Sequence, residues 1–445
     1  MKICVITSLY KPYSKGGAER VVEDIVKGLA GKGHEVLVVT TGHLFAHPSN
    51  GIKLKHSFCE EPALCDSRTG YRQDAEQIKI IRFYPCNLFW FWDIDKKKIW
   101  LRLPWHIIDV FNLYSYFKIK KILKKGKPDI VMTHNLKGIG YTAPVAIRVC
   151  GIKHIHTAHD VQLVEPSGLI SQENKKAKKQ KNNIIIKIYS FFTRILFASP
   201  DIVISPSEWL LAFYTSRGFF PKSRKLVMRN PIPAIPSFLN GPFQKQDSSL
   251  AKEGEESRSA RDGYSNSHFA KEFIDLNLLY IGQIEEHKGI VFLINAVKKL
   301  ENICLDIIGT GTKMDAIKTI CKDCDRIKIR GFIENSQVYN FIVQNDFVIV
   351  PSLCAENAPK VIYESFSCGA PVIASNIGGI PELVKNGYNG YVFEAGIAES
   401  LRAVIKKCIK EKDRWRELRE NTLKSIEGWD IDKYLDLLLK EIFRD

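Results

Sequence analysis

The chain alternates between short apolar runs and longer stretches in which apolar residues recur every three or four positions. In the first half, the runs that we expect to form buried strands are residues 3–7, 35–40, 128–133, 153–157, 201–205 and 225–229. Between the first two runs, Val21, Val22, Ile25 and Leu29 share one face of a helix. Strands that alternate with amphipathic helices are typical of a parallel sheet covered by helices on both faces. The pattern therefore predicts an α/β domain over residues 1–231.

The same pattern restarts after an interruption. Residues 237–270 are rich in Ser, Gly, Lys and Glu and contain few large apolar side chains, which is typical of a disordered insertion. The strands expected beyond it are residues 277–282, 303–308, 326–330, 347–350 and 371–374. We predict a linker over residues 232–276, a second α/β domain over 277–427, and an amphipathic C-terminal helix within 428–445.

Two helical stretches of the first half need closer interpretation. One helix is predicted from residue 105 to 125, with lysines near its C-terminal end, where cations suit the helix dipole. Another follows a Lys-rich stretch, residues 171–183, that we expect to be a mobile loop. Its apolar face comprises Ile184, Ile185, Ile188, Phe191, Phe192, Ile195 and Leu196. We favour packing of this face in the core, and contact with a lipid surface is the alternative.

The charge of the chain narrows the choice of partners. The formal net charge is +16 at pH 7, so an anionic partner is expected. Nucleotide sugars and an anionic membrane surface both qualify, whereas nucleic acid is not expected, because no nucleic-acid-binding motif is recognisable. No run of about 20 apolar residues exists, so we expect no transmembrane span. The first strand is too short for a signal peptide, which favours a cytoplasmic location, with peripheral contact at the inner face of the membrane as an extension.

Candidate metal ligands are few. Eleven cysteines are scattered along the chain, which suits free thiols in a reducing compartment, and Cys321 and Cys324 form a CxxC pair without the second pair that zinc needs. Asp93 and Asp95 form an Asp-x-Asp motif, but no Rossmann-type strand directly precedes it. We therefore expect no metal and no other cofactor. The aromatic cluster at 89–92, beside three lysines, suits a membrane interface, an acceptor groove or a local hydrophobic cluster.

The chemically most informative stretch runs from Glu356 to Glu364. It follows an apolar run and a Pro-Ser break, and Pro359 suits the first position of a helix. The N–H groups of Lys360 to Ile362 would then lie at the positive end of that helix, where a phosphate binds well. Acids at this place do not bind the phosphate itself, but they accept hydrogen bonds from the hydroxyls of an attached sugar or ribose. The helix dipole alone also explains two acids in such positions.

This stretch and its continuation, Ser-Cys-Gly-Ala-Pro-Val-Ile-Ala-Ser-Asn-Ile-Gly-Gly-Ile-Pro-Glu382, resemble glycosyltransferase family 4. That family contains retaining enzymes of GT-B fold that use nucleotide sugars, and the resemblance covers most of the chain. It implies two Rossmann-like domains, each with a doubly wound parallel sheet, that face each other across a cleft. The donor would bind mainly to the second domain and the acceptor mainly to the first. The C-terminal helix would cross back to the first domain, and no metal would be needed.

The resemblance also implies roles for single residues. Glu364 would hold the ribose hydroxyls, Glu356 the sugar hydroxyls and Lys288 the diphosphate. Catalytic roles would fall to His159, Glu356 and Lys288. The residues that would line the donor site are Gly16, Gly17, Gln283, Gly331, Phe332, Ala358, Pro359, Lys360, Val361, Ile362 and Glu364. The first two of these lie in a loop that does not match GxGxxG, so a dinucleotide fingerprint is absent.

Position in the predicted sheet separates these candidates further. His159 follows a strand directly and would face the crevice where open α/β sheets bind ligands. His134 follows the neighbouring strand in the same way and is the second choice. Gln283 departs from the family, which usually has an Arg there, and Gln carries no charge. Either another cation compensates, for which Lys360 and Arg229 are candidates, or the affinity for phosphate is lower.

Together these observations predict a retaining hexosyltransferase that uses a nucleotide sugar. Its acceptor would be a glycan or lipid-linked glycan at the cytoplasmic membrane face, in polysaccharide or glycolipid biosynthesis. A sugar-nucleotide epimerase of the same fold is one alternative. A non-catalytic basic protein that binds nucleic acid or a lipid surface is another. The presence of Glu356, Glu364, Lys288 and His159 argues against a decayed site, and Gln283 argues slightly for one.

Overall fold

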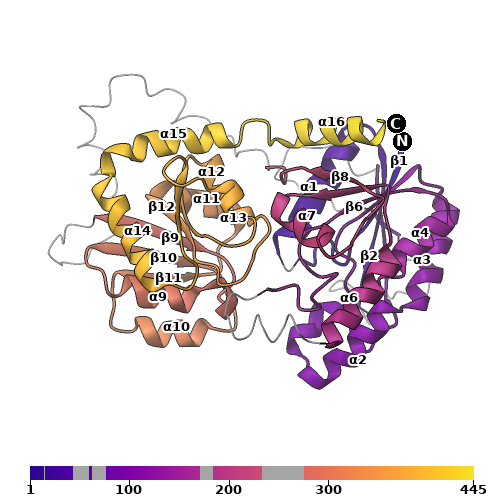
Figure 1. Cartoon of the computed structure of the whole chain (residues 1–445), viewed down its shortest axis with the longest axis horizontal. Coiled ribbons are helices and arrows are strands. Elements are labelled where there is room, and N and C mark those ends of the chain that lie inside the picture. Colours follow the sequence, from indigo (N-terminus) through magenta and orange to yellow (C-terminus); the bar gives the residue numbers. More distant parts are fainter. Residues whose placement is uncertain (15, 44–59, 63–76, 171–183, 233–274, 445) are drawn as a thin grey trace.

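The computed structural model describes residues 1–14, 16–43, 60–62, 77–170, 184–232 and 275–444. They form two α/β domains that lie side by side, and the last two helices run along one side of both (Figure 1). The predicted fold class, with a doubly wound parallel sheet in each domain, is confirmed. The insertion expected at 237–270 and the mobile loop expected at 171–183 lie outside the described residues.

The first sheet has eight strands, and all of its pairs are parallel except that of β3 with β4. In spatial order the strands are β3 (Glu60–Pro62), β4 (Ile78–Phe83), β2 (Glu35–Thr41), β1 (Lys2–Ile6), β5 (Ile130–Thr133), β6 (Lys153–Thr157), β7 (Ile202–Ser205) and β8 (Arg224–Val227). The winding reverses at β1, which pairs with β2 on one side and β5 on the other. A ligand-binding crevice is expected beyond the carboxyl ends of strands at such a reversal.

Helices cover both faces of this sheet. They are α1 (Gly17–Gly31), the 3₁₀ turn η2 (Phe91–Lys96), α2 (Ile99–Val110), α3 (Leu113–Gly126), α4 (Ala143–Val149), α6 (Ile184–Phe197) and α7 (Glu208–Thr215). The single helix predicted over 105–125 is wrong, because the chain turns between α2 and α3. Asn112 at this turn caps α3, since its side-chain oxygen accepts the N–H of Ser115 at 2.8 Å.

The second sheet has six strands and is entirely parallel. In spatial order these are β11 (Ile327–Gly331), β10 (Ile303–Ile308), β9 (Leu276–Ile281), β12 (Phe347–Val350), β13 (Val372–Ser375) and β14 (Gly390–Phe393). The five predicted strands agree with β9 to β13 to within one or two residues, whereas β14 was not predicted. Its short apolar run is bounded by glycine and asparagine, so it lacks a strong periodic signal.

The helical elements of the second half enclose this sheet and then return to the first domain. They are η5 (Glu286–Lys288), α9 (Ile290–Val297), α10 (Met314–Cys321), α11 (Asn335–Gln344), α12 (Lys360–Ser367), α13 (Ile380–Leu383), α14 (Ala398–Lys410), η6 (Lys412–Arg414), α15 (Trp415–Ser425) and α16 (Ile431–Ile442). The core on one sheet face includes α9, α10 and α14, and the core on the other includes α11, α12 and α13.

The last helix, α16, belongs to the core of the first domain. Leu435 and Leu438 are fully buried there, together with the apolar face of α1. Gly28 of α1 allows this approach, because a Cβ at that position would lie 2.6 Å from Leu435 Cδ1. Lys32 adds an ion pair to Asp436 at 2.7 Å. The chain after α15 therefore ties the second domain to the first (Figure 1).

The core packing favoured for the face of α6 is wrong in large part. Its residues Ile184, Ile185, Ile188, Phe191, Phe192 and Ile195 are exposed. The buried side of the helix instead carries Tyr189, Thr193 and Phe197. Hydrogen bonds explain this orientation, because the Tyr189 hydroxyl donates to the Gln162 carbonyl at 2.8 Å and Thr193 donates to the Leu163 carbonyl.

Candidate functional site

The loop between β12 and α12 lies directly against the first domain. Asn357 in this loop is buried, and its amide donates to the His159 carbonyl at 3.1 Å. The Ser207 hydroxyl of the first domain donates to the Asn357 side-chain oxygen. The N–H of Ala355 donates to the Ile170 carbonyl at 2.8 Å. The carboxyl ends of β6 and β12 therefore meet at the domain junction, which is where sequence reasoning expects the reaction.

Glu356, in the same loop, forms an ion pair with Lys288. The distance from Lys288 Nζ to Glu356 Oε2 is 2.6 Å, and the Ser352 hydroxyl donates to the other carboxylate oxygen. Burial raises the pKa of Glu356, but Lys288 and Ser352 outweigh it and hold the pKa below its ordinary value. Burial lowers the pKa of Lys288, but the Glu356 carboxylate raises it by more, so the net shift of the Lys288 pKa is upward. Both groups therefore stay charged at neutral pH.

Helix α12 points its N-terminus at the N-terminus of α1. Lys360 Nζ lies 3.2 Å from Asp24 Oδ2, and Arg20 Nη1 lies 3.7 Å from Glu364 Oε1. A Cβ at Gly17 would lie 3.2 Å from the Cβ of Lys360, so the two helix ends are in close contact. Burial raises the pKa of Glu364 despite the nearby Lys360 and Arg20, and burial likewise raises that of Asp24 despite Lys360. Two residues expected to bind the donor thus have partners in the first domain.

The start of α12 differs slightly from the expectation. Pro359 is the residue before the first helical residue, with φ −58° and ψ 122°. The N–H of Ile362 donates to the Pro359 carbonyl at 3.1 Å, so it is not free to bind a phosphate as predicted. The N–H groups of Lys360 and Val361 come first in the helix, where no intrahelical acceptor is available. Ala358 lies in the loop just before them and is partly buried.

The two candidate histidines lie side by side in the first domain. His134 Nδ1 is 2.9 Å from His159 Nε2, and the rings are stacked. Burial lowers the pKa of His159 to about 4. His134 is almost fully buried, and burial lowers its pKa well below the ordinary value. Both imidazoles are therefore neutral near pH 7. His159 is the more exposed of the two and adjoins the loop that holds Glu356.

The remaining donor-site candidates lie at the carboxyl ends of strands. Gly16 and Gly17 are exposed at the start of α1, and Gln283 is exposed after β9. Gly331 ends β11, and the side chain of Phe332 is 74% exposed beyond it. The carboxyl edge of the second sheet thus carries Gln283, Phe332 and the loop of Glu356. Only that loop is joined by the contacts above to the first-domain residues.

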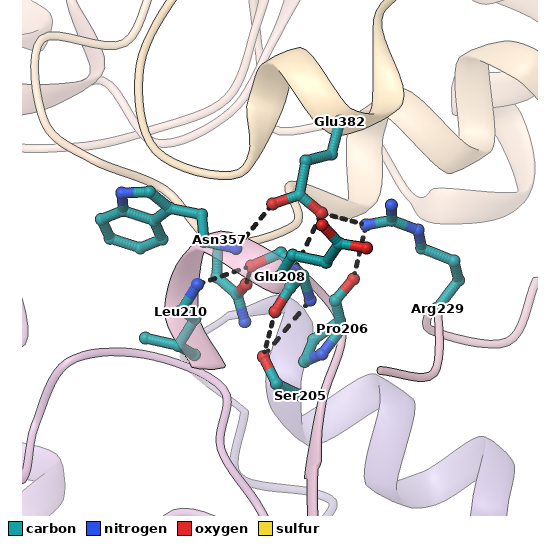
Figure 2. Close-up of polar contacts among 9 residues, drawn as sticks. Ser205, Pro206, Glu208, Leu210, Arg229, Asn357 and Glu382 are labelled. Atoms are coloured by element: carbon teal, nitrogen blue, oxygen red, sulfur yellow. Dashed lines mark hydrogen bonds and ion pairs between the residues drawn. The ribbon is translucent and has the colours of Figure 1, made fainter. Parts of the chain in front are cut away.

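Glu382 was not assigned a role from the sequence, yet it joins the two domains (Figure 2). Its carboxylate accepts the N–H groups of Glu208 at 2.9 Å and Trp209 at 2.7 Å, at the positive end of α7. Arg229 Nη1 lies 3.0 Å from the same carboxylate and also donates to the Pro206 carbonyl at 2.7 Å. Arg229 is therefore held at this junction, and it is not placed to supply the positive charge that Gln283 lacks.

Other residues were missed because their partners lie far away in the sequence. Arg20 and Asp24 read as ordinary surface residues of α1, and only the fold brings them to α12. Asn357 lies within the informative stretch, but its contact with the His159 carbonyl cannot be read from spacing. Gly379 has the clearest sequence signal, the Gly-Gly pair before Glu382. A Cβ there would collide with the Asn357 carbonyl, so this close approach requires glycine.

The described residues contain no cluster of three or more His, Cys, Asp or Glu side chains suited to a metal ion. Asp93 and Asp95 lie on η2, where Asp93 pairs with Lys96 at 3.2 Å. Cys321 is buried on α10 and Cys324 follows it as a second free thiol. The absence of a metal requirement stays a prediction.

Comparison with known proteins gives two family matches. The family described as Glycosyltransferase Family 4 matches residues 15–234, and the one described as Glycosyl transferases group 1 matches residues 268–425. An uncharacterized 42.6 kDa protein in the cps region of Klebsiella pneumoniae is 23% identical, over 88% of this chain and 90% of its own. The lipopolysaccharide 1,2-N-acetylglucosaminetransferase of Salmonella typhimurium is 26% identical, over 61% of this chain and 70% of its own. The structure of Anabaena Alr3699/HepE in complex with UDP aligns over 99% of both chains, with TM-score 0.65 and 16% identity.

Proposed function

The chain belongs to glycosyltransferase family 4, of the group 1 type, and from this premise we propose that it transfers a sugar from a nucleotide-sugar donor to a glycan acceptor. We further propose that the transfer retains the anomeric configuration and needs no metal. The solved structure with UDP and the curated lipopolysaccharide transferase support a nucleotide donor and a glycan acceptor. The donor would bind mainly to the second domain, and the acceptor mainly to the first.

One observation carries this proposal. Lys288, on η5, forms an ion pair with Glu356 in the loop that leads into α12, and Asn357 holds that loop on the His159 carbonyl. A cation, a helix N-terminus and carboxylates thus adjoin the carboxyl end of β6. This set suits a molecule with a diphosphate at one end and hydroxyls around it. Lys288 and the first N–H groups of α12 would hold the diphosphate, and Glu356 and Glu364 would accept the sugar and ribose hydroxyls.

The chemistry follows from this placement. For retention, an acceptor hydroxyl attacks the anomeric carbon from the face that the phosphate leaves, the bond from that carbon to the phosphate oxygen breaks, and the proton of the hydroxyl ends on the leaving diphosphate. Positive charge develops on the sugar and negative charge on the leaving group. Lys288 stabilises that negative charge, and positioning supplies much of the remaining rate enhancement. Neutral His159 can accept or donate a hydrogen bond at the sugar without adding a charge.

A thermal-shift screen against a panel of sugar nucleotides tests donor binding. At about 100 times its dissociation constant, a bound donor stabilises the folded chain by about 2.7 kcal/mol. We expect one nucleotide class to raise the melting temperature, and Glu364→Ala to weaken its binding by about 2 kcal/mol, because ribose hydrogen bonds are lost. The matched control is Glu420→Ala, an exposed acid on α15 paired with Arg416. Equal shifts for the wild type and Glu364→Ala would remove Glu364 from the donor site.

Product analysis then tests the reaction. Incubation with the donor and candidate glycan acceptors should yield a longer glycan and free nucleoside diphosphate. A nucleotide sugar that returns epimerised, with no transfer, would identify an epimerase of the same fold instead. Failure of every donor to react, together with tight RNA binding, would favour a non-catalytic binding protein.

A further inference from the structure

Three helices on one side of the first domain expose apolar stripes at helical spacing. Those on α2 are Trp100, Leu103 and Ile107, followed by Phe111; those on α3 are Leu113, Tyr114 and Phe117; those on α6 are Ile184, Ile185, Ile188, Phe191, Phe192 and Ile195. Several are largely exposed, for example Trp100 at 65% and Ile184 at 66%. Monomeric proteins rarely expose contiguous apolar surface on this scale unless it binds something. We call this surface the α2–α3–α6 face.

The stripes lie on neighbouring helices, and those of α2 and α6 are in direct contact. The ring of Phe111, at the end of α2, contacts the ring of Phe192 on α6 with centroids 5.0 Å apart. Helix α3 packs on α4, and Arg148 of α4 donates to the Phe197 carbonyl of α6 at 2.8 Å. Figure 1 shows α2, α3 and α6 together on the lower right of the first domain. The apolar side of α6 faces outward because Tyr189 and Thr193 fix its other side by hydrogen bonds.

The charges on these three helices are predominantly positive, although Asp93 and Asp95 lie just before α2 and Asp93 pairs with Lys96. Residues 96–127 contain one acid, Asp109, and residues 184–197 contain none. Asp109 is buried and accepts the N–H of Gly138, so it does not reach the surface. The cations of the two segments are Lys96, Lys97, Lys98, Arg102, Lys118, Lys120, Lys121, Lys124, Lys125, Lys127, Lys187 and Arg194. On α3, Lys121 and Lys124 continue the outward stripe of Phe117 at helical spacing.

We propose that the α2–α3–α6 face docks onto the surface of an anionic lipid bilayer. An apolar stripe flanked by lysines and arginines is the arrangement of a helix that lies in the membrane interface. Its cations would contact lipid phosphates while its Trp, Phe and Ile side chains enter the boundary of the acyl chains. Charge argues against a second copy of the chain as the occupant, because two such faces would repel each other. No described helix is both long and apolar enough to cross a bilayer, so the contact is interfacial.

Docking would also place the acceptor side of the proposed site near the membrane, a consequence that rests on the proposed function. Asp109 of α2 accepts the N–H of Gly138 at 2.9 Å, in the loop that follows β5. Phe91 of η2 fills the space beside Gly138, where a Cβ would lie 2.6 Å from the Phe91 Cβ. The same loop begins with His134, the neighbour of His159. A lipid-linked glycan would thus reach the junction from the docked side.

Vesicle co-sedimentation of the full chain tests the docking. The vesicles contain phosphatidylcholine alone or phosphatidylcholine mixed with phosphatidylglycerol. We expect binding to the mixed vesicles and a loss of about tenfold or more in Ile188→Glu/Ile195→Glu, because two apolar contacts become acids. The matched control is Ile397→Glu/Leu423→Glu, the same change at exposed positions of the second domain. It should bind like the wild type.

A variant with fewer positive charges isolates the electrostatic contribution to vesicle binding from the apolar contribution. Lys121→Gln/Lys124→Gln/Lys187→Gln should lose about tenfold or more on mixed vesicles, and its binding should no longer weaken as steeply with salt. Equal vesicle binding by the wild type and both face variants would overturn the proposal. A second result would also overturn it. In that case the wild type does not bind vesicles, but without vesicles it forms a concentration-dependent dimer, and the apolar variant no longer forms that dimer. Donor thermal shifts, measured in parallel, report folding and the donor site separately from docking.

Discussion

Lys288 and Glu356 neutralise each other at the domain junction, so removal of either one leaves an uncompensated charge. Only 26% and 16% of these side chains is exposed. We expect Lys288→Met to lower the free energy of unfolding by about 3 kcal/mol, measured by urea denaturation. The double variant Lys288→Met/Glu356→Gln should recover most of that loss, because no charge is then left unpaired. If the loss of unfolding free energy in the double variant equals the sum of the losses in Lys288→Met and Glu356→Gln, the two groups do not interact.

His159 and Asp160 are neighbours whose pKa values move in opposite directions. Burial lowers the pKa of His159 to about 4 and raises that of Asp160 to about 6. Unfolded His159 takes up a proton below about pH 6.5 while the folded form does not, so its contribution to stability falls as pH drops from 6.5 to 4. Folded Asp160 keeps its proton up to about pH 6, so its contribution falls as pH rises from 4 to 6.

Single variants at these two positions should therefore change the pH dependence of stability in opposite directions. Thermal unfolding from pH 4 to 7 should show that Asp160→Asn removes a penalty of up to about 3 kcal/mol that the wild type carries above pH 6. His159→Asn should remove a penalty of similar size that the wild type carries near pH 4. Slopes of the same sign in both variants would contradict these assignments.

The contact between helices α1 and α12 should influence how tightly the donor binds. Asp24 holds Lys360, a residue that we propose for the donor site, at 3.2 Å. Asp24→Asn should free the Lys360 charge for the donor phosphates and increase donor affinity about two- to fivefold, measured by calorimetry. Glu23→Gln is the control, because Glu23 pairs within the first domain with Lys11 and Lys27. It should leave the affinity unchanged. Unchanged affinity in Asp24→Asn would mean that Lys360 does not contact the donor.

Elements with strong periodicity could be predicted from the sequence, and the failures have physical causes. The strands from β9 to β13 lie between turn residues, and all are largely buried apolar runs except β11, an edge strand that alternates apolar and basic residues, so their bounds were nearly right. The break between α2 and α3 rests on the Asn112 cap, a local hydrogen bond that competes with a continuous apolar pattern. For α6, periodicity identified the helix but not which side is buried. That choice depends on the hydrogen bonds of Tyr189 and Thr193 to a distant loop.

At the scale of the whole molecule, α16 secures the connection between the domains. Leu435 is fully buried against α1, whereas Leu437 on the same helix is 46% exposed. Leu435→Ala should lower the free energy of unfolding by about 3 kcal/mol, because it leaves a cavity in the first-domain core. Leu437→Ala should change it by less than about 0.5 kcal/mol. Similar losses in both variants, measured by denaturant unfolding, would show that α16 is not docked as described.

The candidate site was predictable to the extent that its residues are close in sequence. Glu356, the turn before α12 and Lys288 belong to short motifs, and the fold brings them together. Contacts between the domains could not be predicted, because Asp24, Arg229 and Glu382 find their partners only when both sheets are in place. Sequence reasoning offered Arg229 as a phosphate cation, and its ion pair with Glu382 shows why a charge alone is a weak indicator.

The central claim is that Lys288, which ends η5 and pairs with Glu356 before α12, binds the diphosphate of the donor. Calorimetric titration with the nucleoside diphosphate and the corresponding monophosphate, on the wild type and on Lys288→Met, tests it most directly. The wild type should bind the diphosphate at least about tenfold more tightly, because the second phosphate meets the Lys288 charge. That preference should largely disappear in the variant, while monophosphate affinity changes little. A preference of the same size in both proteins would contradict the account.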